Sequence, residues 1–333
     1  MKLTTLRRAV VPGVAALAMT LTLAACGDDA DDTKGGGGAT GGNGDYSLDT
    51  SVTGEVAVDG SSTVYPMTTA AQELMKADGS SIEVSVGQSG TGGGFEVFCK
   101  GETDISDASR PIKEDEEAPI CAESGVDYTE LLVATDALTV VVHKDLAVDC
   151  VTVDELIALF GPKSKAKNWN EINPEFPDQA ITGFIPGTDS GTYDYMAADV
   201  VGDDSEALRK DFESSEDDNV LVNGVSGTKG GVGFFGYTYY EQNADKLKAL
   251  QIDGGEGCVA PSAETAQDGS YTPLARPLFI YVNNKSYTDK PAVKEFTNYY
   301  IANLADIATG AQYIALNEKD YADTQSKLAA IGG

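Results

Sequence analysis

The chain has 333 residues, of which 41% are hydrophobic, so it is long enough and apolar enough to fill the cores of two ordinary domains. It carries 53 Asp and Glu against 23 Lys and Arg, a formal charge of −30. Such a surface repels phosphodiesters, which argues against nucleic-acid binding, and the hydrophobic content argues against intrinsic disorder.

The N-terminal segment is typical of an export signal. Arg7 and Arg8 precede an apolar run over 9–25 that is too short and too early for an ordinary membrane span. The run ends in Leu-Ala-Ala before Cys26, which resembles the bacterial lipobox, so removal of residues 1–25 would leave Cys26 to carry two or more acyl chains. We therefore expect an exported protein, anchored by lipid at Cys26 to the outer face of the cell membrane. The alternative is a plain secretory signal with an incidental cysteine.

The next segment, 26–45, consists mainly of Gly, Asp, Thr and Asn. This composition predicts a flexible, self-repelling tether rather than a folded element. The folded part is expected to begin near Tyr46.

From Tyr46 on, short apolar runs alternate with helical patterns. Strands are predicted over 55–60 and 81–87, a helix over 66–79 lies between them, and another helix is expected to start at 94–96. Strands and helices that alternate with short connections indicate an α/β fold with a largely parallel sheet.

A further helix is predicted over 152–161. Thr152 has the character of an N-cap, and Glu155, three residues later, completes a capping box. The residues Asp-Tyr-Met-Ala-Ala-Asp-Val-Val over 194–201 also have a helical pattern.

Two long extended runs, 130–144 and 276–283, lie far apart in the sequence and are expected to cross between two lobes. Lobe one is then predicted to hold 46–138 and 278–333, and lobe two 139–277.

The four cysteines after the signal are an even number in an oxidising compartment, which favours two disulfides over a metal site. Cys99 and Cys121 fall in the first predicted lobe, and Cys150 and Cys258 in the second. We expect each pair to join within its lobe, because a bridge between the lobes would lock the hinge. His143, the one histidine, lies in a strand pattern and is expected to be a surface or hydrogen-bonded residue. The sequence therefore has almost none of the residues that a zinc site or a Ser-His catalytic site requires.

Three turns rich in hydroxyl groups and glycine stand between a predicted strand and a predicted helix. They are 59-DGSSTVYP-66, 85-SVGQSGTGGGFE-96 and 183-GFIPGTDSGTYDYM-196. The first N–H groups of a helix are unpaired, glycines let such groups converge on an anion, and this edge of an α/β sheet is where ligands bind. Each turn alone can be a helix cap. Together the three turns favour a dehydrated anion bound by neutral dipoles and hydroxyls.

A buried dianion also needs a formal positive charge, and arginine presents a planar fork of donors to tetrahedral oxyanions. The best candidate is Arg110 in 104-DISDASRPI-112. The alternative is a surface ion pair of Arg110 with Asp107 or Glu114.

In this order, the motifs SSTVYP, GQSGTGGGF, DISDASRPI, GTDSGTYDYM and GVGFFGYTYY resemble those of the phosphate-binding proteins of bacterial phosphate ABC importers, the PstS family, in its lipoprotein form. The resemblance covers about residues 55–330. It implies a two-lobed type II periplasmic binding fold, with mixed sheets flanked by helices and a ligand cleft between the lobes. It also implies inorganic phosphate as ligand, an ABC permease as partner, a monomer, and neither catalysis nor a cofactor nor a metal.

The resemblance also assigns site residues, by match to the family's motifs. The expected phosphate-binding residues are Ser62, Thr63, Val64, Ser89, Ser109, Arg110, Ser190, Gly191 and Thr192. Pro186 stands where many members carry an arginine, and Ser109 where many carry an aspartate that accepts the proton of hydrogen phosphate. Arg110 is therefore expected to replace the arginine, and Asp107 or Asp189 to supply the acceptor. Arg276 is expected outside the site, in a crossing segment.

A carboxylate acceptor would reject sulfate, which has no proton to donate. Other functions remain open from the residues alone: binding of sulfate, molybdate or arsenate, phosphoryl transfer by an enzyme, or a lipid-tethered adhesin or signalling ectodomain.

Overall fold

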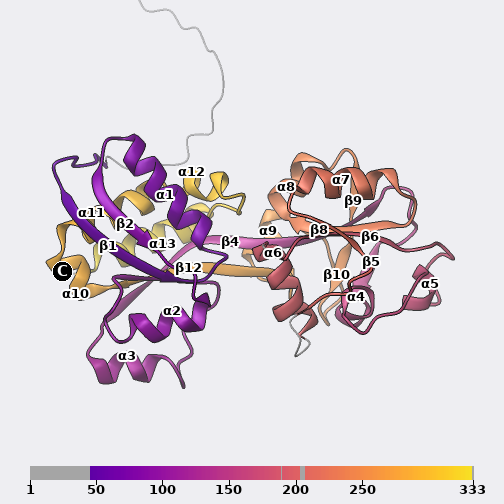
Figure 1. Ribbon diagram of the computed structural model, residues 1–333, viewed down its shortest axis with the longest axis horizontal. Coiled ribbons are helices and arrows are strands. Elements are labelled where there is room, and N and C mark those ends of the chain that lie inside the picture. Colours follow the sequence, from indigo (N-terminus) through magenta and orange to yellow (C-terminus); the bar gives the residue numbers. More distant parts are fainter. Residues whose placement is uncertain (1–45, 189, 203–206, 332–333) are drawn as a thin grey trace, which may run out of the picture. The chain divides into compact units, whose positions relative to one another are not determined.

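The structure is a computed structural model that describes residues 46–188, 190–202 and 207–331 (Figure 1). The predicted signal peptide, Cys26 and tether fall within residues 1–45 and lie outside the described residues, as does Asp189. Within the described ranges, none of the helices combines the length and the hydropathy that a membrane span requires.

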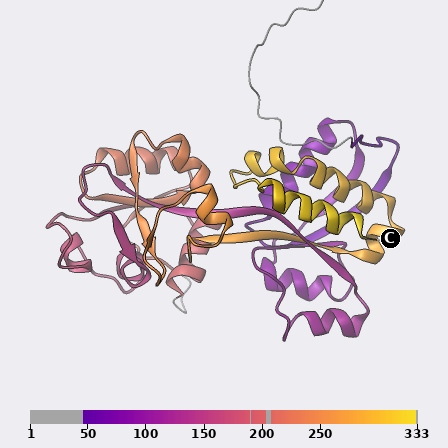
Figure 2. The same ribbon diagram turned by 180° about the vertical axis from the view of Figure 1, so that it is seen from behind.

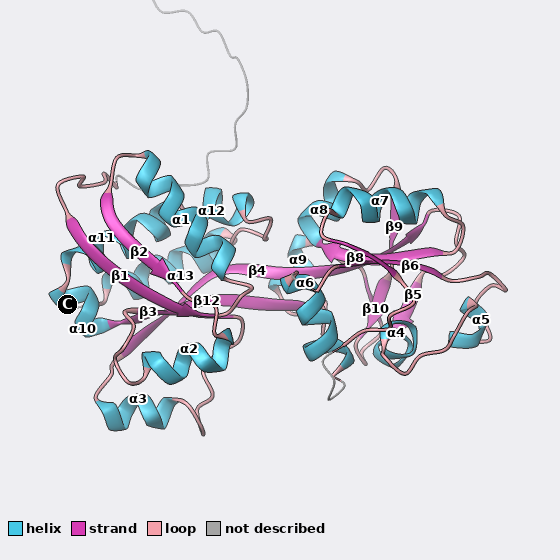
Figure 3. Cartoon of the chain, in the orientation of Figure 1, coloured by secondary structure: helices cyan, strands magenta, loops and turns pink. Residues whose placement is uncertain are grey.

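Strands and helices alternate along most of the chain (Figure 3). The strands are β1 (Thr53–Gly60), β2 (Ser81–Val86), β3 (Ile105–Ala108), β4 (Tyr128–His143), β5 (Cys150–Thr152), β6 (Thr182–Pro186), β7 (Glu213–Ser215), β8 (Gly231–Gly236), β9 (Leu247–Ala249), β10 (Gln251–Asp253), β11 (Cys258–Val259) and β12 (Ala275–Asn283). The first helices are α1 (Tyr65–Ala77), α2 (Gly90–Phe98), α3 (Ala118–Ser124), α4 (Val153–Phe160), α5 (Trp169–Ile172), α6 (Gly191–Asp194) and the π-helix η1 (Tyr195–Val201). The remaining helices are α7 (Asp218–Gly227), α8 (Tyr237–Gln242), α9 (Ala263–Gln267), α10 (Asn284–Asp289), α11 (Pro291–Ala302), α12 (Leu304–Gly310) and α13 (Glu318–Ala329).

The main sheet of the described chain is mixed. Its strands follow the order β2-β1-β3-β12-β4-β8-β6-β7, and β9 pairs with β4. The pairs β1–β2, β1–β3, β6–β7 and β6–β8 are parallel, whereas β12 is antiparallel to β3 and to β4. The parallel expectation therefore holds within each half of the sheet, and the two strands that join the halves make the whole sheet mixed.

Strand β12 pairs with the first part of β4, Tyr128–Ala137, and the two strands pass between two separate hydrophobic cores (Figures 1 and 2). Along β4, Leu131 and Val133 belong to the first core, and Leu138 and Val140 belong to the second. We call the parts of the chain around these two cores lobe one and lobe two. Both strands are buried along most of their length, which explains why their sequences are apolar runs rather than alternating patterns.

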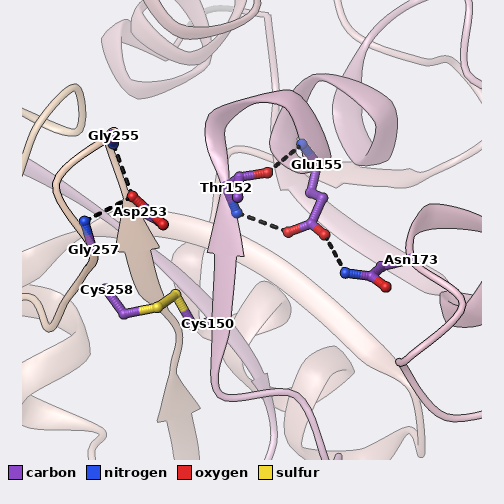
Figure 4. The surroundings of a disulfide bond; sticks show 8 residues. All are labelled: Cys150, Thr152, Glu155, Asn173, Asp253, Gly255, Gly257 and Cys258. Carbon is purple, nitrogen blue, oxygen red and sulfur yellow. Dashed lines mark hydrogen bonds between the residues drawn. A yellow bond between two sulfur atoms is a disulfide. The ribbon is translucent and has the colours of Figure 1, made fainter.

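Local sequence explains where the helices lie. Helix α1 buries Met67, Ala71 and Met75, which are spaced by four residues and form one apolar stripe. Helix α4 begins with the expected capping box: Thr152 Oγ1 accepts from the Glu155 N–H at 3.2 Å, and the Glu155 carboxylate accepts from the Thr152 N–H at 2.8 Å (Figure 4).

Helix α2 starts at Gly90 and not at residue 94 as the sequence predicted. Its glycines are thus part of the helix. A Cβ atom at Gly94 would lie 2.5 Å from the Cα of Gly60, so glycine allows the helix to pack directly against the end of β1.

Both disulfides join the expected partners, Cys99 to Cys121 and Cys150 to Cys258. The second bridge links β5 to β11, the two outer strands of a small sheet with β10 at its centre (Figure 4). His143 ends β4, and its Nδ1 accepts from the backbone N–H of Asp145 at 3.1 Å, so the histidine is satisfied as expected.

Candidate anion-binding site

The first turn lies between β1 and α1. The N-cap residue of α1 is Val64, which cannot cap with its side chain, so the hydroxyls of Ser62 and Thr63 are not used as the helix cap. The turn is fixed to β3, since the Ser61 N–H donates to the Asp107 carbonyl at 2.9 Å. This arrangement leaves two hydroxyl groups beside the N-terminus of a helix.

The second turn lies before α2 and contacts the Arg110 segment. The Ser89 N–H donates to Asp59 Oδ1 at 3.0 Å, and the Ser89 side chain makes no cap hydrogen bond. Thr91 Oγ1 accepts from the Ser109 N–H at 3.2 Å and lies 3.1 Å from Ser109 Oγ. The second turn and the loop that follows β3 are therefore joined by their hydroxyl groups.

The third turn, after β6, starts α6. Ser190 is its N-cap and accepts from the Thr192 N–H at 3.2 Å. A Cβ atom at Gly191 would lie 3.7 Å from Thr63 Oγ1, so the first turn in lobe one and the third turn in lobe two adjoin each other. Helix α6 continues directly into η1, and π-helical segments of this kind often occur at functional sites.

Arg110 forms a paired contact with a residue that the sequence did not indicate. Its guanidinium donates to both carboxylate oxygens of Glu117, at 2.8 and 2.7 Å, and lies 5.8 Å from the ring centroid of Phe95. The alternative partners Asp107 and Glu114 are thus wrong. The hydrogen bonds that Arg110 donates to Glu117 raise the pKa of Arg110. Burial opposes ionisation of Glu117, but hydrogen bonds from Arg110 and Lys113 hold its pKa below the usual value.

Arg276, which the sequence placed outside the site, contacts the first turn. Its guanidinium donates to Thr63 Oγ1 at 2.8 Å, and it also pairs with Asp136 at 3.3 Å and Asp199 at 2.8 Å. It lies 3.7 Å from the ring centroid of Tyr195. This residue of β12 therefore joins lobe one, the crossing strands and the η1 helix of lobe two.

A cavity of about 470 Å³ elsewhere in lobe two is lined by no residue of these turns, whereas one of about 430 Å³ lies beside the second turn and the η1 helix. Residues that line the second cavity include Thr91, Ser109, Arg110, Tyr195, Asp199 and Arg276. It thus brings together the second turn, both arginines and η1. Of the expected site residues, Ser109 and Arg110 line the cavity. Thr63 adjoins it through Arg276, and Gly191 adjoins Thr63. Ser62, Val64, Ser89, Ser190 and Thr192 belong to the three turns but are not among the described residues that line this cavity.

Asp107 does not face the cavity. It is wholly buried within lobe one, and both its carboxylate oxygens accept from Thr68 Oγ1, at 3.0 and 2.8 Å. Burial raises the pKa of Asp107 to about 8. The expectation that Asp107 accepts a ligand proton is therefore not supported, because its carboxyl group is occupied inside the lobe.

The donors around the cavity suit an anion. Two guanidinium groups, several hydroxyls and the N-terminus of α2 line it, and two carboxylates, Asp136 and Asp199, pair with Arg276 beside it. Burial raises the pKa of Asp136, although Arg276 opposes the shift. In the described ranges, no group of three or more His, Cys, Asp or Glu residues lies close enough together to hold a metal ion.

Two lobes joined by crossing strands, with a cavity beside those strands whose donors suit an anion, are typical of a solute-binding protein of the periplasmic binding type. The model of the PBP superfamily domain matches residues 46–303. The protein SphX of Synechococcus elongatus is 45% identical over 269 residues, which are 80% of this chain and 79% of SphX. The phosphate-binding protein PstS of Staphylococcus saprophyticus is 40% identical over 323 residues, 96% of this chain and 94% of that protein.

Among solved structures, the crystal structure of a possible phosphate-binding protein from Planctomyces limnophilus is similar to this chain. It has a TM-score of 0.80 and 38% identity, and the match covers 85% of this chain and 100% of that chain. The chain belongs to the PBP superfamily and, within it, to the PstS family of phosphate-binding proteins.

Proposed function

We propose that this protein captures inorganic phosphate outside the cell between its two lobes and delivers it to an ABC import permease. The observation that carries the proposal is the cavity in which Arg110 and Arg276 lie beside the hydroxyl-rich turns. Related chains named phosphate-binding proteins support phosphate over other oxyanions. In this account the chain binds and releases its ligand unchanged and catalyses no reaction.

The proposal includes an exported monomer that is anchored by lipid at Cys26 to the outer face of the membrane. Export and the anchor are supported by the sequence over 1–45, where the lipobox-like end of the signal is followed by an acidic, glycine-rich segment. Incorporation of labelled palmitate into the expressed protein, lost in Cys26→Ser, tests the anchor.

Phosphate would be held by many short donors that exclude water. In this proposal Thr63 and Ser109 offer hydroxyls, and Gly191, which adjoins Thr63, offers backbone N–H groups from lobe two. The two guanidinium groups supply the positive charge, and both are already partly neutralised by carboxylates. The charge of −30 slows encounter with a dianion more than it weakens the bound complex, because surface charge acts mainly on the association rate.

Selection against sulfate requires a carboxylate at the anion. Asp199 lines the cavity and Asp189 belongs to the third turn, so these two residues are the proposed acceptors of the proton of hydrogen phosphate. A fully deprotonated sulfate at the same place could not donate a hydrogen bond to this carboxylate and would be repelled by it.

Titration calorimetry of the purified protein with phosphate and with sulfate tests this function. We expect tight binding of phosphate and no measurable heat with sulfate at equal concentration. The variants Asp199→Asn and Asp189→Asn, made separately, show which carboxylate selects phosphate over sulfate. The variant that removes this carboxylate should bind the two anions with more similar affinities. Tight sulfate binding without phosphate binding by the unaltered protein would overturn the proposal.

A further inference from the structure

The Arg110 segment is fastened to a crossing strand by one buried hydroxyl group. Tyr281 of β12 is wholly buried, and its Oη accepts from the backbone N–H of Ile112 at 2.9 Å. The same hydroxyl donates to the carboxylate of Glu130 on β4. Tyr281 thus connects two strands of the crossing region with the backbone two residues beyond Arg110.

The ring of Tyr281 also supports the cation. It packs edge-on against Phe95 of α2, with ring centroids 4.8 Å apart, and the Arg110 guanidinium lies 5.8 Å from that Phe95 ring. Phe95 and Tyr281 belong to a small separate core that also contains Ile112 and both cysteines of the first disulfide. The second turn and the loop of Arg110 both pack on this core, and Tyr281 connects the core to β12.

Glu130, which accepts the hydrogen bond of Tyr281, reaches the surface of the protein. The Glu130 side chain is 32% exposed and lies 3.7 Å from Lys327 Nζ of α13. Glu130 also lines a cavity of about 450 Å³ between the crossing strands and α13. The path therefore runs from α13 through the crossing strands to the loop of Arg110.

We infer that Tyr281 is a positioning residue for anion binding: its hydroxyl, oriented by Glu130, fixes the loop that holds Arg110 at the cavity. The inference rests on the proposed function. Because Tyr281 belongs to a strand that crosses between the lobes, its hydrogen bond to Ile112 connects the loop of Arg110 to that strand. Arg110 itself donates to the ligand, whereas Tyr281 acts only through that loop.

The variant Tyr281→Phe tests the inference, because it removes the hydroxyl and keeps the ring that packs on Phe95. Loss of one hydrogen bond of this kind should weaken phosphate binding by about fivefold, measured by titration calorimetry. The matched control is Tyr128→Phe. Tyr128 packs against the same Tyr281 ring at 5.5 Å, and its hydroxyl makes no hydrogen bond to another described residue, so its loss should leave the affinity unchanged.

A double-mutant cycle separates positioning from a general loss of stability. In the Arg110→Lys background, Tyr281→Phe should change the phosphate affinity by less than about twofold, because the group that it positions is gone. Full and independent losses in both backgrounds would overturn the inference. Should Tyr281→Phe fail to fold, Glu130→Gln replaces it in the same cycle. A loss of phosphate affinity smaller than about fivefold that disappears in the Arg110→Lys background supports the inference. An unchanged phosphate affinity in Glu130→Gln overturns it.

The outcomes also distinguish this inference from the proposed function. Absence of phosphate binding by the unaltered protein overturns both. Phosphate binding that falls in Arg110→Lys and is unchanged in Tyr281→Phe overturns the positioning role alone. If Arg110→Lys leaves phosphate binding unchanged, the positioning role is also overturned, because Arg110 would then not contribute to anion binding.

Discussion

Arg276 and Thr63 lie 213 residues apart in the sequence and are joined by a hydrogen bond of 2.8 Å between the guanidinium and the threonine hydroxyl. Arg276 stands on β12, where the chain returns to lobe one, and Thr63 lies in the first turn of that lobe. Through its contact with Asp199 of η1, Arg276 also reaches lobe two. One side chain thus touches the first turn and the opposite lobe at the wall of the cavity.

From this contact we expect Arg276→Ala to weaken phosphate binding at least as strongly as Arg110→Ala, by about 30-fold or more in titration calorimetry. The reason is that a buried donor fork is lost and Asp136 is left without its partner. Arg276→Lys keeps a charge for Asp136 and should bind with intermediate affinity.

The control for net charge is Lys100→Ala. Lys100 is exposed and pairs with the exposed Glu96, so its loss changes the charge of the protein equally and should leave the affinity unchanged. An Arg276→Ala protein that is folded and binds phosphate as tightly as the unaltered protein would contradict the role of Arg276.

Gly191 provides a second test, because it faces Thr63 from the other lobe. Its backbone tolerates a side chain, and a Cβ atom would make an ordinary contact of 3.7 Å with Thr63 Oγ1. Gly191→Ala should therefore fold normally and bind somewhat more weakly. Gly191→Val, whose methyl groups extend into the space between the turns, should lose about tenfold or more in affinity, measured by calorimetry.

Gly227→Val is the matched control for this pair. A Cβ atom at Gly227, the last residue of α7, meets no atom within 4 Å, so the same substitution adds bulk to lobe two away from the cavity. Equal losses in Gly191→Val and Gly227→Val would argue against the third turn as part of the site.

The buried carboxyl group of Asp107 predicts a pH dependence of stability. Burial raises its pKa from 3.8 to about 8, so the folded state binds this proton more tightly than the unfolded state. The stability that the neutral acid provides is complete below the unfolded pKa, decreases as the pH rises, and is lost above about 8. The free energy of unfolding should fall with a slope of up to about 1.4 kcal/mol per pH unit in between.

Urea unfolding of the unaltered protein and of Asp107→Asn between pH 5 and 8.5 measures this slope. The amide is neutral at every pH, so the variant should show a flatter profile. Asp211→Asn is the control. Hydrogen bonds from Arg209 and Lys167 hold the pKa of Asp211 low, so this substitution should change the free energy of unfolding by the same amount at every pH between 5 and 8.5. Parallel profiles for the unaltered protein and Asp107→Asn would refute the assignment.

The two disulfides differ in their access to solvent. Cys99 and Cys121 are both buried, whereas Cys258 is exposed and Cys150 is partly exposed. Since thiol exchange requires access to a sulfur atom, dithiothreitol under native conditions should reduce Cys150–Cys258 first. Alkylation followed by peptide mass spectrometry identifies the free thiols in time order. Earlier labelling of Cys99 and Cys121 would show that lobe one opens more readily than its packing indicates.

Local features of the fold were predictable from the sequence, because their causes lie within a few residues. The capping box of α4 depends on Thr152 and Glu155 alone, and the three turns depend on hydroxyls and glycines beside helix starts. The start of α2 was misplaced, since its glycines suit a turn in isolation. They are helical here because Gly94 must approach Gly60 closely.

Features that depend on distant contacts were not predictable in this way. Glu117 becomes the partner of Arg110 because the intervening loop folds back, and no pattern of spacing marks it. Arg276 carried one signal, a charged residue at the start of an otherwise apolar strand. Its partners Thr63 and Asp199 come from other parts of the chain, so its position at the cavity emerges only from the pairing of β12 with β4.

The most direct test of the central claim is a crystal structure of the purified protein grown with phosphate. We expect one tetrahedral anion in the cavity, within hydrogen-bond distance of Arg276, Arg110 and Thr63, with the backbone around Gly191 facing it from lobe two. A phosphate ion that binds tightly in solution but lies outside this cavity, or that contacts neither arginine, would contradict the account.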